Sequence, residues 1–461
     1  MSWPDIAQVD ATQVTALVFA AIACLARLAA AATLFGLAVA VLGALAVWRF
    51  TTCAPRLAPV ALPPVSVLRP LCGAEAGLDA ALETLAAQTY PSVQLVFGVQ
   101  DPDDPALAAV RRLRRRHPGL DIAVAVDARG HGPNRKVCNL INMLPLARHA
   151  VLVFSDSDLH VPPDYLRHLV ATLAEPGVGL VTTLCTGLPT VPGLAARLGA
   201  MQITQGFLPA ALLSRHLGRQ DCLGTTMALG RDTLARVGGL AALVGHLADD
   251  NVLGQLVRRL GLRVALAATV PGTAVPEATL RALWRHELRW ARTIAALVPV
   301  SFAASSLQFP LAWAALAWLC APGEAWAAGL ATGAWLVRGL AAGAVSALLA
   351  RHAGRSCGAA PWRAAALLPA RDLLSVAQVA ASYRGGTVLW RGHVMQVDAG
   401  QAAPAPAGVP HAMRLAAEFA GPPAWNRGSD REAGKAGSKV GPCPNPPKAE
   451  AFGNRFTKSV S

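Results

Sequence analysis

The feature that most constrains this chain is an apolar run near its start. Residues 28–48 are 21 consecutive uncharged positions, and a helix of that length rises far enough to cross a hydrocarbon core about 30 Å thick. The apolar character begins at Val14 and is broken only by Arg27. These residues predict a membrane-spanning helix, so the rest of the chain must fold at or in a bilayer.

The composition agrees with a membrane protein. Charged residues make up 15% of the chain, against roughly 25% in soluble domains, and the mean hydropathy is +0.41. The net charge of +14 comes without a basic run interleaved with aromatic residues, which argues against a nucleic-acid partner. An anionic membrane surface and a phosphate-bearing substrate are the partners that this charge favours.

Charges at the two ends of the apolar run predict its orientation. Arg49 and Arg56 follow it, whereas only Asp5 and Asp10 precede it, so the residues after the run are expected in the cytoplasm. A cleaved signal peptide is the alternative, but no basic residue stands ahead of the apolar run. The nine cysteines form no C-x-x-C pair, which predicts neither a disulfide framework nor a zinc site and fits a reducing compartment.

After the proline-rich linker 54–64, short apolar runs alternate with amphipathic stretches, the pattern of an α/β domain. We expect a parallel, doubly wound sheet whose carboxyl edge carries the function. The expected strands are Val65–Leu68, Val93–Val99, Ile122–Val126, Val151–Phe154 and Leu180–Leu184, and the expected helices lie near 78–88, 105–116, 137–147 and 164–174.

Hydrophobic character returns after Thr293 in three blocks of membrane length, each interrupted by proline or charged residues. Pro299 and Pro310 interrupt the first, Arg338 lies in the second, and Arg371 and Asp372 lie in the third. Part of this region is therefore expected to be re-entrant or packed at the interface. The blocks are 294–320, 325–350 and 364–382, and the Pro- and Gly-rich residues 401–461 are expected to be a disordered basic tail.

Two carboxylates, Asp156 and Asp158, directly follow the apolar run Val151–Phe154, which has the length of a buried strand. In extended backbone residues i and i+2 project to the same side, so both carboxylates can reach one Mg²⁺ or Mn²⁺. A solvated turn with two acids is the alternative for these residues alone. Ligands of an open α/β sheet bind at the carboxyl ends of its strands, which favours a metal site.

Other charged motifs accompany this pair. The turn QDPDDP at 100–105 can accept hydrogen bonds from a nucleotide or can be a proline-bounded acidic turn, and GPNRK at 132–136 places a cation where a diphosphate can bind. LADDN at 247–251 and HELRW at 286–290 follow. Their plain alternatives are acids favoured by a helix dipole and an interfacial anchor pair. Residues 277–293 place aromatic and apolar positions among basic ones, as in a helix lying in the headgroup plane.

In this order the motifs resemble those of the membrane-bound members of glycosyltransferase family 2, and within them the ceramide glucosyltransferase group. The group has a DD, an NxK, an Asp-Ser, an acidic pair after GG and a (Q/R)xxRW box, which appear here as QDPDDPA, NRK, SDSD, LADDN and HELRW. The phrases HGPNRKVCNLINMLP and WRHELRWART are most similar to the bacterial branch that glycosylates hopanoids, pentacyclic membrane lipids. The box departs from the pattern because it opens with His286.

The resemblance implies an α/β fold: a cytoplasmic GT-A-type (Rossmann-like) domain flanked by transmembrane helices. It implies an inverting transfer of N-acetylglucosamine or glucose from a UDP-sugar to a membrane lipid, with Mg²⁺ or Mn²⁺ as cofactor. In an inverting transfer a carboxylate on the acceptor side takes the hydroxyl proton, and the resemblance assigns this role to Asp250. It places the metal on Asp156 and Asp158. It places the substrates on Asp104, Lys136, Asp249, His286, Arg289 and Trp290.

We therefore expect a multi-pass protein of the bacterial inner membrane with no nucleic-acid partner. The expected organisation is an anchor over 1–53, the GT-A domain over 54–276, the interfacial helix over 277–293, a membrane region over 294–395 and a tail over 396–461. A ceramide glucosyltransferase is the nearest alternative. A processive polysaccharide synthase would need a continuous membrane channel, and a catalytically inactive scaffold would have no use for the whole set of acids.

Overall fold

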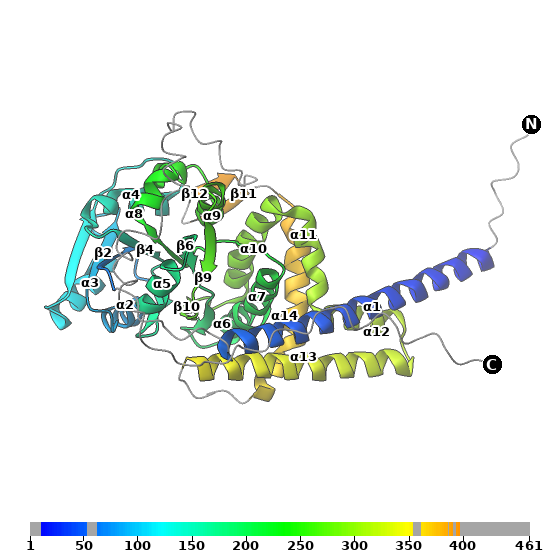
Figure 1. Cartoon of the computed structure of the whole chain (residues 1–461). Coiled ribbons are helices and arrows are strands. Elements are labelled where there is room, and N and C mark those ends of the chain that lie inside the picture. Colours follow the sequence, from blue (N-terminus) through cyan, green and yellow to red (C-terminus); the bar gives the residue numbers. More distant parts are fainter. Residues whose placement is uncertain (1–10, 53–61, 354–360, 386, 391–392, 397–461) are drawn as a thin grey trace, which may run out of the picture.

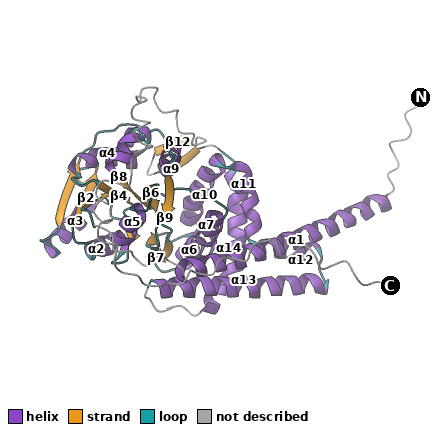
Figure 2. Cartoon of the chain, viewed as in Figure 1, coloured by secondary structure: helices purple, strands orange, loops and turns teal. Residues whose placement is uncertain are grey.

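The computed structural model describes residues 11–52, 62–353, 361–385, 387–390 and 393–396. The tail expected over 396–461 lies, apart from its first residue, outside the described residues. In the described chain the strands gather in one half of the molecule and a group of long helices forms the other (Figure 2).

A seven-stranded sheet forms the centre of the α/β domain, in the order β3–β2–β1–β4–β8–β6–β9. All five predicted strands are present, and β1 lies between β2 and β4, with Val67 paired to Leu95 on one side and to Val153 on the other. The strands are β1 (Val65–Pro70), β2 (Val93–Val99), β3 (Asp121–Val126), β4 (Val151–Ser155), β6 (Val178–Thr182), β8 (Thr226–Gly230) and β9 (Arg263–Leu266).

The sheet is mixed, so the prediction of an all-parallel sheet was wrong. β8 pairs antiparallel with both β4 and β6, whereas β6 and β9 are parallel to each other. Strand direction depends on the path of the connection as well as on the residues of the strand. Because β8 runs in reverse, the loop that precedes it reaches the sheet edge where the parallel strands end.

Alternation along the strands builds a hydrophobic layer on each face of the sheet. Val151 and Val153 of β4 belong to one buried cluster, whereas Leu152 and Phe154 belong to the other. Helices α2 (Leu78–Ala86), α3 (Ala106–Arg116) and α5 (Tyr165–Leu173) cover the first face, and α4 (Arg135–Met143), α8 (Arg231–Arg236) and α9 (Asp249–Arg259) cover the second. The four helices predicted between the strands are confirmed.

A small second sheet connects this domain to the long helices. It consists of β5 (Leu159–His160), β10 (Gly272–Val275) and β7 (Thr186–Pro189), in that order. α6 (Leu194–Met201) packs on β7 and β10 and leads through a π-helix, η2 (Gln202–Phe207), into α7 (Leu208–His216). Sequence reasoning missed all three strands, because segments of two to four residues show no readable alternation.

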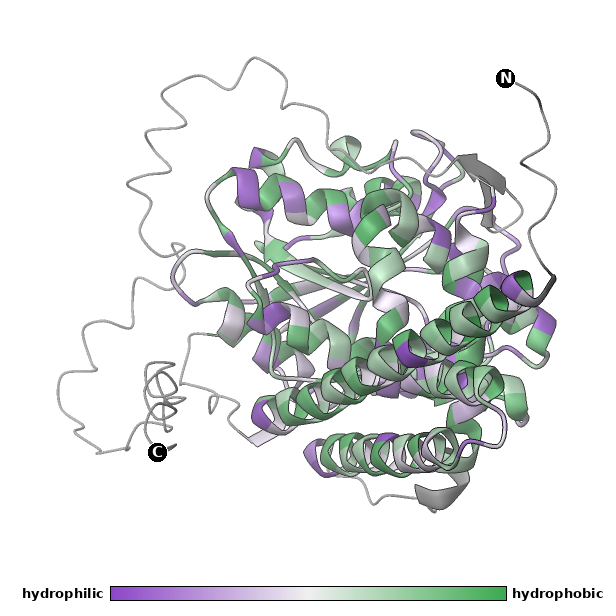
Figure 3. Cartoon of the chain, turned by 90° about the vertical axis from the view of Figure 1, so that its right-hand side faces the viewer, coloured by the Kyte–Doolittle hydropathy of each residue, from purple (hydrophilic) through white to green (hydrophobic). Residues whose placement is uncertain are grey.

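Within the described residues, three helices are long and apolar enough to cross a membrane: α1 (Ala11–Thr52), α13 (Ala325–His352) and α14 (Pro361–Ser382). α1 and α13 lie side by side and are dominated by hydrophobic residues (Figures 1 and 3). The first predicted block, 294–320, is broken. α11 (Pro299–Ala304) with the following turn η4 (Ser305–Gln308) is bent by 70° from α12 (Pro310–Cys320), as expected from its prolines.

Two glycines let α1 approach its neighbours closely. A Cβ atom at Gly36 would lie 2.6 Å from the carbonyl oxygen of Leu307, and one at Gly43 would lie 2.9 Å from Cβ of Pro209. The two positions are seven residues apart and therefore share a face of the helix. This face joins α1 to the bend before α12 and to α7 of the α/β domain.

Candidate active site

The carboxyl end of β4 meets the start of α4 and the start of α9. Lys136 in the first turn of α4 places its Nζ atom 2.7 Å from Oδ1 of Asp156 and 4.0 Å from Oδ2 of Asp249. The same Nζ donates to the carbonyl oxygen of Gly224, in the loop before β8. The structure therefore brings together residues from the predicted NRK, SDSD and LADDN motifs.

Asn134 fixes this geometry from the N-terminus of α4. Its Oδ1 accepts from the backbone N–H of Val137, which caps the helix, and its Nδ2 donates to the backbone of His246 and to Oδ1 of Asp249. An Asn cap satisfies one of the free N–H groups at a helix start. Here the same side chain also orients Asp249, a role that sequence reasoning missed although Asn134 lies inside the NRK motif.

Asp250 lies beside the loop before β8. A Cβ atom on Gly224 would be 2.9 Å from Oδ2 of Asp250, so this position leaves room for the carboxylate only because it is glycine. The Oδ1 atom of Asp250 accepts from the N–H of Asn251, and its side chain stays half-buried. Asp249 is buried against Asn134 and Lys136. Of the two acids, Asp250 is the less buried.

Burial and charge together set the protonation of the cluster. Burial raises the pKa of Asp250 to about 6, and the charge of Asp249 adds to this effect. Burial also raises the pKa of Asp249, although Lys136 opposes it. For Lys136 burial lowers the pKa, but the charges of Asp156 and Asp249 outweigh burial and hold the pKa above its usual value. The lysine is thus a fixed cation, and Asp250 is poised to take up a proton near neutral pH.

The backbone after Asp156 turns, which corrects the geometric premise for a shared metal site. The N–H of Leu159 approaches the carbonyl oxygen of Asp156, so residues 156–159 form a turn. Asp158 accepts at Oδ2 from Thr273 Oγ1 of β10, 2.6 Å away, whereas Asp156 faces Lys136. The expected extended backbone at 156–158 is replaced by a turn, so the argument that residues i and i+2 project to one side does not apply here. A metal role for Asp158 stays a prediction.

A buried arginine, which sequence reasoning missed, lies behind these acids. Arg69 of β1 is fully buried, and its Nη2 donates to Ser155 Oγ and to the carbonyl oxygen of Leu159. Burial lowers the pKa of Arg69, and the nearby charges of Asp158, Asp156 and Glu75 oppose that effect. Its signal was a charged residue in an otherwise apolar strand, a position that is rarely buried without a partner.

Asp104 connects two loops near the same sheet edge. Both of its carboxylate oxygens accept from the N–H of Gly73, and Oδ1 also accepts from the N–H of Ala106 at the start of α3. These contacts tie the loop after β1 to the loop after β2. The predicted contact of Asp104 with a nucleotide stays a prediction.

The HELRW box lies on α10 (Leu280–Leu297), a helix capped by Thr279. His286 Nδ1 hydrogen-bonds Glu277 Oε1, and its ring meets the Trp290 ring edge-on at 4.4 Å between centroids. The Arg289 guanidinium carbon lies 5.9 Å from the centroid of Trp290. Burial raises the pKa of Glu277, but the hydrogen bond and charge of His286, together with a backbone hydrogen bond and the charge of Arg289, outweigh it and leave the pKa below its usual value. Glu277 was not among the predicted site residues.

α6 lies between this box and the small sheet. A Cβ atom on Gly199 of α6 would lie 2.8 Å from Val275 of β10 and 2.9 Å from Leu283 of α10. β10 in turn carries Thr273, which holds Asp158. The helix that carries the HELRW box and the side chain of Asp158 therefore both contact the layer formed by α6 and β10.

The donor set fits a divalent cation that takes most of its ligands from a substrate. Asp156 keeps 31% of its side chain exposed, and three carboxylates surround a single lysine. Within the part of the chain that the structure describes, no three His, Cys, Asp or Glu side chains are arranged to hold a metal ion alone. Mg²⁺ and Mn²⁺ are commonly held by one or two carboxylates together with phosphate oxygens, which these residues allow.

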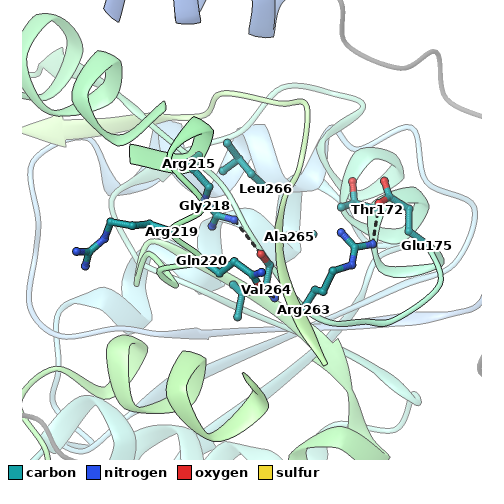
Figure 4. A pocket seen from close by; sticks show the side chains of 10 residues that line it. All are labelled: Thr172, Glu175, Arg215, Gly218, Arg219, Gln220, Arg263, Val264, Ala265 and Leu266. Atoms are coloured by element: carbon teal, nitrogen blue, oxygen red, sulfur yellow. Dashed lines mark hydrogen bonds and ion pairs between the residues drawn. The ribbon is translucent and has the colours of Figure 1, made fainter. Parts of the chain in front are cut away.

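A pocket of about 300 Å³ lies away from the carboxylate cluster, at the edge strand β9 (Figure 4). Its arginines are already engaged: Arg215 donates to the carbonyl oxygens of Val264 and Asp221, and Arg263 lies 3.6 Å from Glu175. None of the predicted site residues lines this pocket. The carboxylate cluster is therefore the better candidate for the chemistry.

Comparison with known proteins identifies the family of this chain. Residues 28–403 match the family model described as Glycosyl transferase family 21. Ceramide glucosyltransferase 1 of Caenorhabditis elegans is 23% identical over 247 residues, 54% of this chain and 53% of the relative. Ceramide glucosyltransferase of Candida albicans is 28% identical over 121 residues, 24% of this chain and 22% of the relative. The matches thus span about half the length, or less, of these curated relatives.

Among solved structures, a mannosyltransferase of Pyrobaculum calidifontis in complex with GDP-Man and Mn²⁺ is 21% identical, with a TM-score of 0.45 over 79% of this chain and 99% of that one. The matching family model carries the number 21, whereas the sequence motifs were assigned to family 2. The expected ceramide glucosyltransferase likeness is confirmed by the relatives, and the expected closeness to hopanoid enzymes stays a prediction.

Proposed function

Because the chain belongs to glycosyl transferase family 21, we propose that it is an inverting glycosyltransferase that moves a sugar from a UDP-sugar to the hydroxyl of a membrane lipid. The observation that carries this proposal is the cluster of Lys136, Asp156, Asp249 and Asp250 at the carboxyl end of β4. A fixed cation beside a carboxylate of raised pKa is what such a transfer needs.

Asp250 is the proposed base. The acceptor oxygen forms a bond to the anomeric carbon while the bond from that carbon to the diphosphate oxygen breaks, and the acceptor proton passes to a carboxylate oxygen of Asp250. UDP leaves with the electron pair of the broken bond. The pKa of about 6 for Asp250 lets it be ionised at neutral pH and still accept a proton.

Lys136 and Asp156 are proposed to act on the opposite side, where the diphosphate leaves. Lys136 stays charged and can donate to phosphate oxygens, and Asn134 keeps Asp249 oriented toward the same place. A bound Mg²⁺ or Mn²⁺, held by Asp156, would neutralise charge on the diphosphate. His286, Arg289 and Trp290 are proposed to border the sugar or the acceptor.

The relatives and the helices support a lipid acceptor. The curated relatives are ceramide glucosyltransferases, and α1, α13 and α14 can each span a bilayer. We propose a hopanoid as the acceptor and N-acetylglucosamine or glucose as the sugar, on the strength of the phrases around Asn134 and His286. Ceramide is the alternative acceptor. The proposed location is the bacterial inner membrane, with the α/β domain in the cytoplasm.

A direct product assay tests this proposal. The full chain in nanodiscs is incubated with Mn²⁺ and radiolabelled UDP-N-acetylglucosamine or UDP-glucose, with a hopanoid, ceramide or no added lipid, and the labelled lipid is identified by mass spectrometry. We expect label in one lipid only, and none with the Asp250→Asn variant. Label released as free sugar in every sample, with no lipid product, would contradict a lipid acceptor.

A further inference from the structure

A small pocket lies where α1 and α13 meet the π-helix η2 and the bend before α12. It offers about 20 Å³ of space, and its walls include the apolar side chains of Val39, Ala40, Ala341 and Val345. Three polar side chains, Gln205 of η2, Gln308 of η4 and Arg338 of α13, also line it. None of these residues belongs to the carboxylate cluster.

Two of these polar side chains, Arg338 and Gln205, are buried and have incomplete hydrogen bonding. Arg338 is 5% exposed and Gln205 is 9% exposed. Arg338 Nη2 donates to the backbone oxygen of Gln205, and Gln205 Nε2 donates to Ser346 Oγ. Within the described residues, Nε of Arg338 and Oε1 of Gln205 have no hydrogen-bond partner. One donor and one acceptor are thus left over beside the same small space.

The charge of Arg338 is already compensated. Asp372 of α14 is fully buried, its Oδ1 lies 3.7 Å from Arg338 Nη2, and its Oδ2 accepts from the N–H of Leu311 at the start of α12. A buried cation that has a carboxylate partner does not need an anionic ligand. The pocket therefore suits a neutral polar group better than a phosphate.

We propose that this pocket binds the hydroxyl group of a membrane lipid, with the hydroxyl donating to Oε1 of Gln205 and accepting from Nε of Arg338. A hydroxyl is both donor and acceptor, which matches the two unpaired atoms. One water-sized group needs about 10 to 15 Å³, so the space holds one hydroxyl and excludes a sugar ring. The inference rests on the proposed function, because it takes the lipid to be the acceptor.

The surroundings of the pocket explain why the hydroxyl belongs to a lipid. Val39 and Ala40 are half-buried at the edge of the pocket, and nearby Val41 and Leu42 of α1 and Leu340 of α13 are exposed on helices of membrane-spanning length. An exposed apolar surface on such helices is where lipid tails lie. A lipid can thus place its hydroxyl in the pocket while its tail stays along α1 and α13.

The pocket is connected to the candidate active site by a short chain of contacts. Thr204, next to Gln205, hydrogen-bonds through Oγ1 to the N–H of Gly187 in β7. β7 pairs with β10, where Gly187 is the partner of Thr273, and Thr273 donates to Asp158. A lipid hydroxyl held at Gln205 is therefore separated from the SDSD turn by η2 and the small sheet. In this position the lipid would be bound before its hydroxyl enters the candidate active site.

The first test compares two variants that change the same hydrogen bond. Gln205→Met removes Oε1 at nearly constant volume, and Ser346→Ala removes the partner of Gln205 Nε2 but leaves Oε1 in place. We expect Gln205→Met to raise the acceptor KM by about two- to tenfold, as for the loss of one hydrogen bond, with the UDP-sugar KM unchanged. Ser346→Ala should leave the acceptor KM within about twofold.

The second test does not depend on turnover. The full chain in micelles is photolabelled with a diazirine-bearing hexadecanol or with its methyl ether, which cannot donate. We expect the alcohol to label peptides around residues 39–40 and 338–345, the ether to label them less, and Gln205→Met to remove the difference. Equal labelling by both probes would overturn the proposal and leave a pocket that holds only water.

The two proposals fail in different ways. If the alcohol labels the pocket as expected but no lipid accepts sugar from any UDP-sugar, the proposed function is wrong and the hydroxyl site stands. If a lipid product forms while Gln205→Met changes neither the acceptor KM nor the labelling, the function stands and the hydroxyl site is wrong.

Discussion

Asp249 and Asp250 are adjacent in sequence, yet their surroundings give them different roles. Asp249 is buried and held by Asn134 and Lys136, whereas Asp250 is only half-buried and lies beside Gly224. We expect Asp250→Asn to reduce kcat by several powers of ten, somewhat more than the roughly 10² to 10⁴ usual for general base catalysis, because no other group is placed to replace it.

Binding measurements separate this loss from misfolding. UDP affinity of Asp250→Asn, measured by calorimetry, should stay close to that of the unchanged chain, since a base acts only when the acceptor attacks. Asp232→Asn is the matched control, because Asp232 also lies in the first turn of a helix but is exposed. More than a tenth of the activity remaining in Asp250→Asn would make the assignment wrong.

The raised pKa of Asp250 predicts opposite effects of pH on activity and stability. The base must be ionised, so kcat/KM should rise as pH passes through about 6. The folded pKa lies above the ordinary value of 3.8, so the contribution of this group to stability is complete below pH 3.8 and is lost as pH rises through about 6.

Two profiles measure these effects. The kcat/KM of the unchanged chain is followed from pH 4.5 to 8, and the Tm of Asp250→Asn is compared with that of the unchanged chain from pH 4 to 7. The Tm of the variant minus that of the unchanged chain should increase as pH rises over this range, because asparagine does not ionise. A kcat/KM that is flat between pH 5 and 7 would contradict the prediction.

Asp156 and Asp158 should differ in their effect on metal dependence. Asp156 faces Lys136 and the carboxylate cluster, whereas Asp158 accepts from Thr273, a contact that an asparagine oxygen can also make. We expect Asp156→Asn to raise the Mn²⁺ concentration needed for half-maximal UDP binding at least about tenfold, and Asp158→Asn to raise it less. EDTA should stop turnover, and Mn²⁺ should restore it. Equal effects of the two variants would indicate that Asp158 binds the metal as strongly as Asp156 does.

The position of α10 depends on a buried ion pair that spans two elements. Arg371 of α14 is 2% exposed, and its two Nη atoms lie 2.9 and 3.0 Å from the carboxylate oxygens of Glu287, inside the HELRW box. Gln378 donates to the same carboxylate, and Arg371 also donates to the backbone oxygen of Leu198 in α6. The pair therefore fixes the box relative to α14 and α6.

Breaking this pair should be costly because it leaves a buried charge without a partner. We expect Arg371→Met to destabilise the protein by about 3–5 kcal/mol, measured as a loss of Tm in detergent. The double variant Arg371→Met with Glu287→Met removes both charges and should recover part of that loss. A double variant less stable than Arg371→Met alone would show that the pair does not act as a unit.

At the scale of elements, sequence reasoning succeeded where an apolar run is long enough to show its period. The strand Val151–Phe154 and the helix near 164–174 are both present. Strands β8 and β9 of the main sheet were not predicted, and neither were β5, β7 and β10, four of these five having at most four residues. The reversed direction of β8 was also missed, because direction depends on long-range pairing. The same limit explains Asp158, whose partner Thr273 is 115 residues away.

The motif order correctly brought Lys136, Asp156 and Asp249 together, because the starts of α4 and α9 and the end of β4 lie at one sheet edge. The order of motifs does not reveal contacts that a residue within one strand makes with the neighbouring strand. Arg69 reaches Ser155 from the neighbouring strand, and only the register of β1 against β4 determines that approach. Sequence reasoning therefore found the cluster but missed the arginine beneath it.

At the scale of the whole molecule, the residues of the candidate active site all precede Thr293, and the residues after Gln396 lie outside the described chain. Truncation after Gly400 should therefore leave turnover within about twofold of that of the full chain, because the removed residues lack the apolar content to form a core. Truncation before Trp390 is expected to be harmful. Activity is measured for the two truncations and the full chain at equal amounts of membrane-inserted protein. A large loss of activity in the truncation after Gly400 would show that the tail contributes to function.

The reversed strand β8 has a consequence for how such chains diversify. The loop at residues 217–225 begins at the end of α7, which packs on α1, and ends beside Lys136 and Asp250. Insertions or deletions there can reshape the wall between the membrane and the cluster without moving the strand that precedes Asp156. Under the proposed function, changes of loop length near residue 217, which leave Gly224 in place, would alter the surroundings of the acceptor and keep the contacts of Lys136 and Asp250.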